Sequence, residues 1–230
     1  MMLPQIQKGA VANLPMAASA CAYGSVLGVL AAQKDVSWLE LLVMNVSVFA
    51  GSAQFVMVDM WAPHLPVVEM VFAVMIINLR YLLIGASLNP VFLGATLPQK
   101  SIIMHLVADE NWAVTMAAHR RGAATIWFLL GGGLCLFTVW SFGTLFGHRL
   151  GALVRNPEAW ALDSAFTAVF TALAISLWRG KTDLLPWAGA ATLAILTESL
   201  LPGKWYIVIG GVGGALLPLL RKEAPHDSPR

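Results

Sequence analysis

The sequence predicts an all-α polytopic membrane protein, a single bundle of seven or eight transmembrane helices. The first reason is composition. Of the 230 residues, 58% are hydrophobic and 11% are charged, whereas soluble domains carry about 25% charged residues. The second reason is a series of apolar runs near the length of about 20 residues that a helix needs to cross a bilayer. No charged or Pro/Ser-rich stretch divides these runs, so residues 1–230 are expected to form one transmembrane domain with a short polar tail at 221–230.

Seven runs are expected to span the membrane, at residues 9–32, 39–60, 66–88, 123–147, 160–178, 184–201 and 205–220. An eighth segment, 98–119, is long enough to cross but contains Lys100, His105, Asp109 and Glu110, so it is either a polar interior helix or a segment that enters the membrane without crossing. Short cytoplasmic loops are rich in Lys and Arg. With seven or eight spans, this rule predicts a cytoplasmic C-terminus. The net charge of +2 gives no basis for nucleic-acid binding.

The span at 39–60 is unusually polar. On a continuous helix, Asn45, Ser52 and Asp59 would share one face, and Gln54 would lie nearly opposite. Such a helix is either central in the bundle or unwound around Gly51 and Ser52, as transporter helices are beside a substrate. The alternative is close helix packing through small residues, with side-chain hydrogen bonds to neighbouring helices.

The span at 66–88 contains Asn78 and Arg80 within an otherwise apolar run. Arginine stays protonated in proteins, and a guanidinium at the centre of a span costs about 2.5–3.5 kcal/mol on insertion scales. Two interpretations follow. Arg80 either reaches the headgroups or forms a structural ion pair, or it lines a cavity.

Ionisable residues of two other segments are candidates for proton transfer. In 98–119, His105 and Asp109 stand four residues apart and would share a helical face, where they could relay a proton or form a solvated hairpin face. No third ligand stands at a diagnostic spacing, so no metal site is expected. In 160–178, Asp163 is followed by threonines at four-residue spacing. It could also be a first-turn acid that favours the helix dipole.

Small residues recur at four-residue intervals, at Gly143, Gly147 and Gly151 and again at Gly210 and Gly214. Such patterns permit close approach of helices in membranes. They are expected to act mainly within the chain.

Several of these motifs resemble the AzlC family, the large subunit of bacterial branched-chain amino-acid exporters. The resemblance rests on Phe49-Ala-Gly51-Ser-Ala-Gln54-Phe55 and on Asn78-Leu-Arg80-Tyr81-Leu-Leu-Ile-Gly85-Ala-Ser87-Leu88. Asp109-Glu110 is similar to the acidic pair of the family's Thr-Asp-Glu motif, although Ala108 replaces the threonine. Leu162-Asp163 is similar to its later Gly-Leu-Asp, with Ala161 in place of the glycine.

The resemblance implies export of branched-chain amino acids, sometimes methionine, across the bacterial cytoplasmic (inner) membrane, driven by the proton gradient. It also implies a small AzlD-like membrane subunit as partner. No cofactor is expected. The amino acid would bind through its carboxylate, its ammonium group and its apolar side chain.

The residues themselves suggest how such a substrate would be held. Arg80 could bind the carboxylate bidentately, helped by backbone N–H groups if the second span breaks at Gly51 and Ser52. The candidates for the ammonium group are Gln54, Asn78 and Asp59, and those for walling the side chain are Phe49, Phe55 and Tyr81. The candidates for proton coupling are Asp109, Glu110, His105 and Asp163.

Two other function classes compete with transport. An intramembrane serine protease needs an elbow serine with a histidine inside a span. Here Ser52 lacks the following glycine, and His64, His119, His148 and His226 fall in loops or the tail. The chain is therefore not expected to be an enzyme. A non-transporting scaffold subunit is the other alternative, but scaffolding alone does not explain Arg80 within an apolar span.

Overall fold

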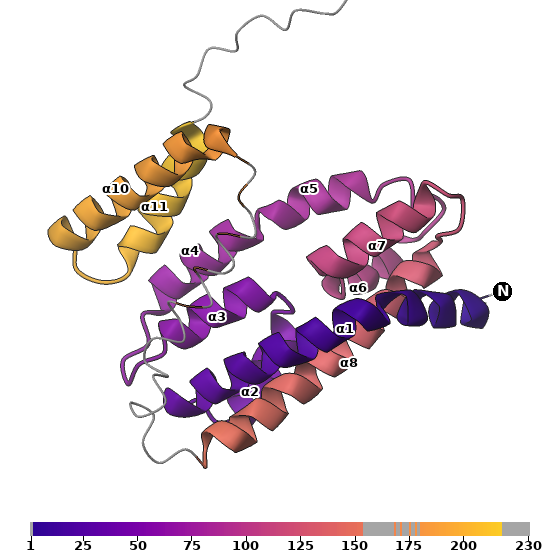
Figure 1. Ribbon diagram of the computed structural model, residues 1–230, viewed down its shortest axis with the longest axis horizontal. Helices are drawn as coiled ribbons and strands as arrows, with labels where there is room; N and C mark the ends of the chain where they lie inside the picture. Colours follow the sequence, from indigo (N-terminus) through magenta and orange to yellow (C-terminus); the bar gives the residue numbers. More distant parts are fainter. Residues whose placement is uncertain are drawn as a thin grey trace, which may run out of the picture. The chain divides into compact units, whose positions relative to one another are not determined.

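A computed structural model describes residues 2–153 and 180–217, together with residues 168, 171, 175 and 178. All regular structure within these residues is helical (Figure 1), as the sequence predicted. Most of the predicted span 160–178, the end of the span 205–220 and the predicted tail 221–230 lie outside the described residues.

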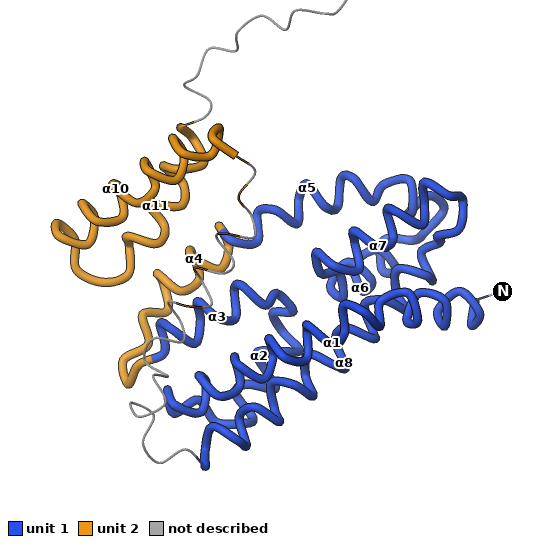
Figure 2. Tube along the Cα trace, in the orientation of Figure 1, with its two compact units in different colours: residues 1–61, 77–166 blue, residues 62–76, 167–230 orange. Residues whose placement is uncertain are grey.

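The chain divides into two compact units (Figure 2), one made of Met1–Trp61 and Ile77–Phe166, the other of Ala62–Ile76 and Thr167–Arg230. In its described part, the first unit contains α1 (Met2–Gln33), α2 (Trp38–Ser47), α3 (Gly51–Asp59), α5 (Arg80–Ser87), α6 (Leu97–His105), α7 (Asp109–His119) and α8 (Ile126–Gly151). The second contains most of α4 (Val67–Asn78), the short 3-10 helix η3 (Lys181–Asp183), α10 (Leu184–Leu200) and α11 (Trp205–Leu216). The single transmembrane domain of residues 1–230 stays a prediction.

Within the described residues, three helical segments are long and apolar enough to cross a membrane: Met2–Gln33, Val67–Ser87 and Ile126–Gly151. They correspond to the predicted spans 9–32, 66–88 and 123–147. The helices Trp38–Ser47 and Trp205–Leu216 are apolar but shorter. The total of seven or eight spans therefore stays a prediction.

The first unit is built on a tight pairing of α1 with α8. Gly143 and Gly147 of α8 lie directly against the backbone of Cys21 and Ser25 of α1, where an added Cβ would collide with a carbonyl group. Small residues let two helix backbones approach this closely. The predicted role of the glycine pattern in packing within the chain is confirmed for this pair.

The second unit repeats this principle in α10 and α11. Gly210 and Gly214 of α11 lie against Ala190 and Ala194 of α10. The aromatic rings of Phe72 and Trp205, both of this unit, lie 5.9 Å apart between centroids.

Two predicted segments of the first unit are interrupted. The run 39–60 forms α2 and α3, separated by the non-helical residues 48–50. The segment 98–119 forms α6 and α7, separated at residues 106–108. Of the two alternatives for 98–119, a single polar interior helix is therefore wrong, whereas entry into the membrane without crossing stays a prediction. In the run 66–88, the change from α4 to α5 falls at Leu79, which keeps helical backbone angles.

A buried apolar cluster holds α5 against the segments that follow it. Its members are Ile84, Leu88, Val91, Phe92, Ile103, Val107 and Leu129. They come from α5, the 88–92 turn, α6, the 106–108 break and α8. The cluster thus fixes the start of α7 relative to α5, where Asp109 and Arg80 stand.

Candidate functional site

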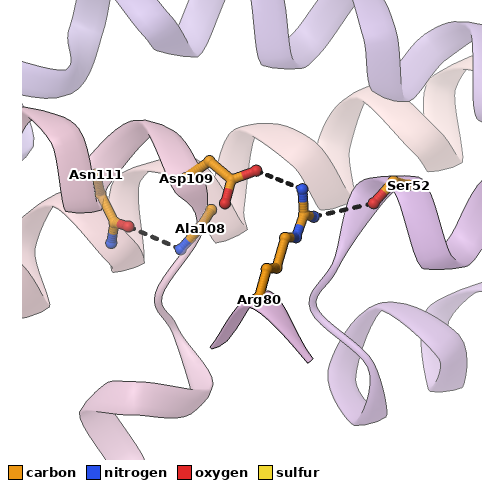
Figure 3. A network of polar contacts seen from close by, with 5 residues as sticks. All are labelled: Ser52, Arg80, Ala108, Asp109 and Asn111. Carbon is orange, nitrogen blue, oxygen red and sulfur yellow. Dashed lines mark hydrogen bonds and ion pairs between the residues drawn. The ribbon is translucent and has the colours of Figure 1, made fainter. Parts of the chain in front are cut away.

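Arg80 is the first residue of α5, and its guanidinium joins α3 to α7 (Figure 3). Its Nη1 lies 2.6 Å from Oδ2 of Asp109, and its Nη2 donates a hydrogen bond to Oγ of Ser52 at 2.9 Å. The Arg80 side chain is 36% exposed and that of Asp109 47%. The structure thus brings together three predicted site residues from three separate segments, and it contains the ion pair that the sequence left as one interpretation of Arg80.

The interruption before α3 places a helix N-terminus at this ion pair. Ser52 is the second residue of α3, and the N-cap residue, Ala50, makes no side-chain hydrogen bond to the helix. The first backbone N–H groups of a helix have no acceptor within the helix, and they carry a partial positive charge. The start of α3 therefore adds positive potential beside the Arg80 guanidinium.

The start of α7 lies on the other side of Arg80. Asp109 is its first residue, a position at which a carboxylate is favoured by the helix dipole. Asn111 closes the preceding break, because its Oδ1 accepts from the Ala108 N–H at 2.7 Å and its Nδ2 donates to the Leu106 carbonyl at 3.0 Å. The Ala108–Asn111 contact is visible in Figure 3. Asn111 thus fixes the backbone just before Asp109, whose carboxylate contacts Arg80.

The break between α2 and α3 is held by Gln54. Its Nε2 donates to the Val48 carbonyl at 2.8 Å and to Oδ1 of Asn45 at 3.2 Å, while its Oε1 accepts from the Trp140 indole at 2.7 Å. Asn45 in turn donates to the Thr144 hydroxyl at 2.7 Å. Gln54, Asn45 and Thr144 have no exposed surface. This network satisfies polar groups that the break would otherwise leave unpaired.

The network corrects one expectation from the sequence. Asn45 and Gln54 would lie on opposite sides of a continuous helix, but the break turns them toward each other. Because both ends of the Gln54 amide already have partners, its position favours a structural role over the predicted contact with an ammonium group.

Sequence reasoning missed Trp140 and Thr144 of α8. Trp140 stands near the middle of the 26-residue helix α8, whereas membrane tryptophans concentrate at the interfaces. A buried indole N–H usually has a hydrogen-bond partner. A tryptophan inside a span was therefore a signal for a polar contact there.

Two buried polar atoms of this segment have no hydrogen-bond partner, Nε of Arg80 and Oδ1 of Asn78. One is a donor and the other an acceptor. The ring of Tyr81 lies 5.3 Å from Cζ of Arg80, within cation–π range. A ligand that accepts a hydrogen bond could satisfy the orphaned Nε.

The predicted aromatic residues of the second span pack within the unit. Phe49, in the break, contacts Phe137 edge to face with ring centroids 5.4 Å apart. Phe55 has no exposed surface and contacts Tyr23 at 5.5 Å. Phe55 is therefore a core residue. Phe49 is the residue directly before the N-cap of α3.

Asp59 lies away from this site. It is the last residue of α3, seven residues from Ser52, or about 10 Å along the helix axis. Its backbone carbonyl accepts from Nζ of Lys34 at 3.2 Å. The structure does not place Asp59 beside Arg80.

The structure does not bring the predicted proton-transfer residues together. The expected shared helical face of His105 and Asp109 is wrong, because α6 ends at His105 and α7 begins at Asp109. His105 instead lies with its Nε2 2.7 Å from the Val46 carbonyl. Glu110 is exposed, and Asp163 lies outside the described residues. Asp109 alone among the four is seen in contact with Arg80.

No group of three His, Cys, Asp or Glu side chains in the described residues could hold a metal ion. What the site offers is a cation with one orphaned donor, an anion and a helix N-terminus. Such a set of groups suits a small zwitterionic or anionic molecule.

The model of the family described as AzlC protein matches residues 15–154. This match covers more than half of the sequence, including the Ser52, Arg80 and Asp109 site. No solved structure gives a significant match.

Individual relatives cover most of the chain. A Bacillus subtilis protein described as "Branched-chain amino acid transport protein AzlC" is 23% identical over 85% of this chain and 77% of its own. An uncharacterized membrane protein of Helicobacter pylori strain J99 is 24% identical over 87% and 88%. One of Archaeoglobus fulgidus is 26% identical over 92% and 93%.

Proposed function

The chain belongs to the AzlC family, and on that premise we propose that it is a secondary transporter subunit that exports branched-chain or similar apolar amino acids. It is a membrane protein related to branched-chain amino-acid transport, as its family and the named relative in Bacillus subtilis indicate. We place it in the bacterial cytoplasmic membrane with its C-terminus in the cytoplasm. Export, the substrate and the energy source are the parts that we propose.

The observation that carries the proposal is the orphaned, buried Nε of Arg80 next to the uncapped start of α3. Arginine presents five N–H donors in a planar fork. Asp109 and Ser52 each take one of them, which leaves the edge of the guanidinium that carries Nε. A carboxylate binds such an edge through two parallel hydrogen bonds. The α-carboxylate of an amino acid fits this position.

The surroundings favour a substrate with an apolar side chain. The Tyr81 ring lies beside the guanidinium, and the buried cluster that contains Ile84 and Val107 follows on α5 and before α7. Small-molecule sites are lined mainly by apolar side chains, with a few polar groups that fix orientation. This combination supports branched-chain and related amino acids.

We further propose that the proton gradient drives export and that a small AzlD-like membrane subunit is the partner. Both follow from the family resemblance. Asp109 is the candidate coupling group of this proposal, because it is an acidic residue in direct contact with the proposed substrate-binding arginine. Intramembrane carboxylates commonly mark proton pathways.

The test is transport by the purified chain in proteoliposomes loaded with labelled leucine, with and without the small subunit, under an imposed pH gradient. We expect the gradient to accelerate leucine efflux above that of protein-free liposomes. Efflux at the protein-free rate under every condition would contradict the proposal and favour a non-transporting scaffold.

A further inference from the structure

The Arg80–Asp109 pair presents a cation and an anion to the same space, and an amino acid carries the complementary anion and cation. Resting on the proposed function, we propose that Asp109 binds the α-ammonium group of the substrate while Arg80 binds its α-carboxylate.

The guanidinium has a donor that neither Asp109 nor Ser52 uses. Asp109 is bound through Nη1 and Ser52 through Nη2, whereas Nε is buried and has no partner. In the proposal, the substrate carboxylate binds Nε beside Asp109 and does not displace it from Nη1, so Asp109 stays in the site when the substrate is bound.

Asp109 in turn has free acceptor capacity. Its Oδ2 contacts Arg80, but an ionised carboxylate has about four lone-pair positions on two oxygens. Its side chain is 47% exposed, so it can be reached from outside the protein core. In an amino acid the ammonium and carboxylate groups are attached to one carbon, and their separation suits a neighbouring cation and anion.

The charge balance supports this arrangement. An ionised Asp109, Arg80 and a zwitterion sum to zero net charge, which suits a segment where unpaired charge is costly. An uncharged side chain at position 109 would remove the anion that the ammonium group needs.

The other titratable groups around Asp109 are few in the described residues. They are Arg80 and Tyr81 on α5, Glu110 on α7 and His105 at the end of α6, which is directed to the Val46 carbonyl. Helices α1 and α8 pack against α7. The titratable residues are Lys8, Cys21 and Tyr23 on α1, and Cys135, His148 and Arg149 on α8. Asp109 is the one carboxylate of this set that contacts Arg80.

The first test uses the unmodified chain in nanodiscs and two ligands that differ only in the amino group, leucine and 4-methylpentanoate. Their affinities are measured at about pH 7, where the carboxylates of both ligands are ionised. We expect leucine to bind more tightly than 4-methylpentanoate, by about tenfold or more, because a hydrogen bond to a charged group contributes about 1.5–3 kcal/mol. Equal affinities of the two ligands would overturn the proposal.

The second test compares Asp109→Asn with Glu110→Gln, its exposed neighbour on α7. Asp109→Asn should weaken leucine binding about tenfold or more while preserving the affinity for 4-methylpentanoate. Glu110→Gln should behave as the parent. If Asp109→Asn fails to fold, the two-ligand comparison on the parent still decides. Leucine binding that is no tighter than the binding of 4-methylpentanoate overturns this inference alone, whereas no leucine binding overturns the proposed function as well.

Discussion

At the scale of single residues, the structure explains how an arginine persists in an apolar segment. Arg80 loses part of its hydration there, and an isolated guanidinium would be costly. The chain offsets this cost with the Asp109 carboxylate at 2.6 Å, the Ser52 hydroxyl and the Tyr81 ring. The compensation is incomplete, since Nε stays orphaned. This orphaned donor is the observation on which the proposed binding role of Arg80 rests.

The first prediction concerns this residue. Arg80→Ala should lower leucine flux at least about tenfold, because one charged hydrogen-bonding partner contributes about 1.5–3 kcal/mol. Arg80→Lys should restore little of the flux, since an ammonium group cannot form the bidentate fork. Flux is measured in proteoliposomes at matched protein content. Arg121→Ala, in the exposed turn after α7, is the control and should transport normally. Near-parental flux in Arg80→Ala would assign Arg80 a structural role.

At the scale of elements, the site depends on two interrupted segments whose second helices begin beside Arg80. Neither interruption contains a proline or glycine within its non-helical residues, 48–50 and 106–108. Each is instead satisfied by an amide side chain from the following helix, Gln54 for α3 and Asn111 for α7. The amides replace hydrogen bonds that a continuous helix would make in its backbone.

The second prediction tests the first of these amides. Gln54→Leu keeps the volume similar but leaves the Trp140 indole N–H without its acceptor and Asn45 and Val48 without their donor. Buried groups without partners cost about 1–3 kcal/mol each, so the free energy of unfolding should fall by about 3 kcal/mol. Thermal unfolding in one detergent measures the change. Ser47→Ala, which removes an exposed bond within α2, should change stability little. Equal stability of both variants would contradict this account.

The third prediction concerns the start of α7. Ala108 occupies the N-cap position with extended backbone angles, φ −119 and ψ 166, where a hydroxyl side chain can accept from the N3 backbone N–H. Ala108→Thr should therefore stabilise the protein by about 1 kcal/mol. The control is Ala113→Thr, an exposed position inside α7, where a β-branched residue should slightly destabilise. A lower unfolding temperature for Ala108→Thr than for the parent would show that the cap position is sterically closed.

At the scale of the whole molecule, the sequence predicted the all-α class of structure better than it predicted where the helices are interrupted. Composition and run length predicted helices, and the glycine spacing predicted close pairing within the chain. The polar residues of 39–60 indicated a possible break around Gly51. The break at 106–108 was not predictable, because it depends on Asn111 meeting the Leu106 carbonyl. The Arg80–Asp109 contact was equally hidden, since it joins residues 29 apart in the chain.

The scaffold that fixes these contacts is the α1–α8 pair, so its packing should control the stability of the first unit. Gly147 of α8 lies against the Ser25 carbonyl of α1, with no space for a Cβ. Backbone atoms cannot move aside as a flexible side chain can. Separating the helices would also loosen Thr144, which anchors Asn45 and the break before α3.

The fourth prediction follows from this geometry. Gly147→Ala should destabilise the protein by about 1–3 kcal/mol, the usual cost of overpacking, even though alanine is the better helix former. Gly211→Ala in α11 is the matched control, since its Cβ would only touch Cγ2 of Ile76 at 3.7 Å. That variant should be neutral or gain up to about 1 kcal/mol. The measurement is the thermal unfolding midpoint of both variants in the same detergent. A gain of stability in Gly147→Ala would mean that α1 and α8 are not packed backbone to backbone, and the position of α3 would then need another support.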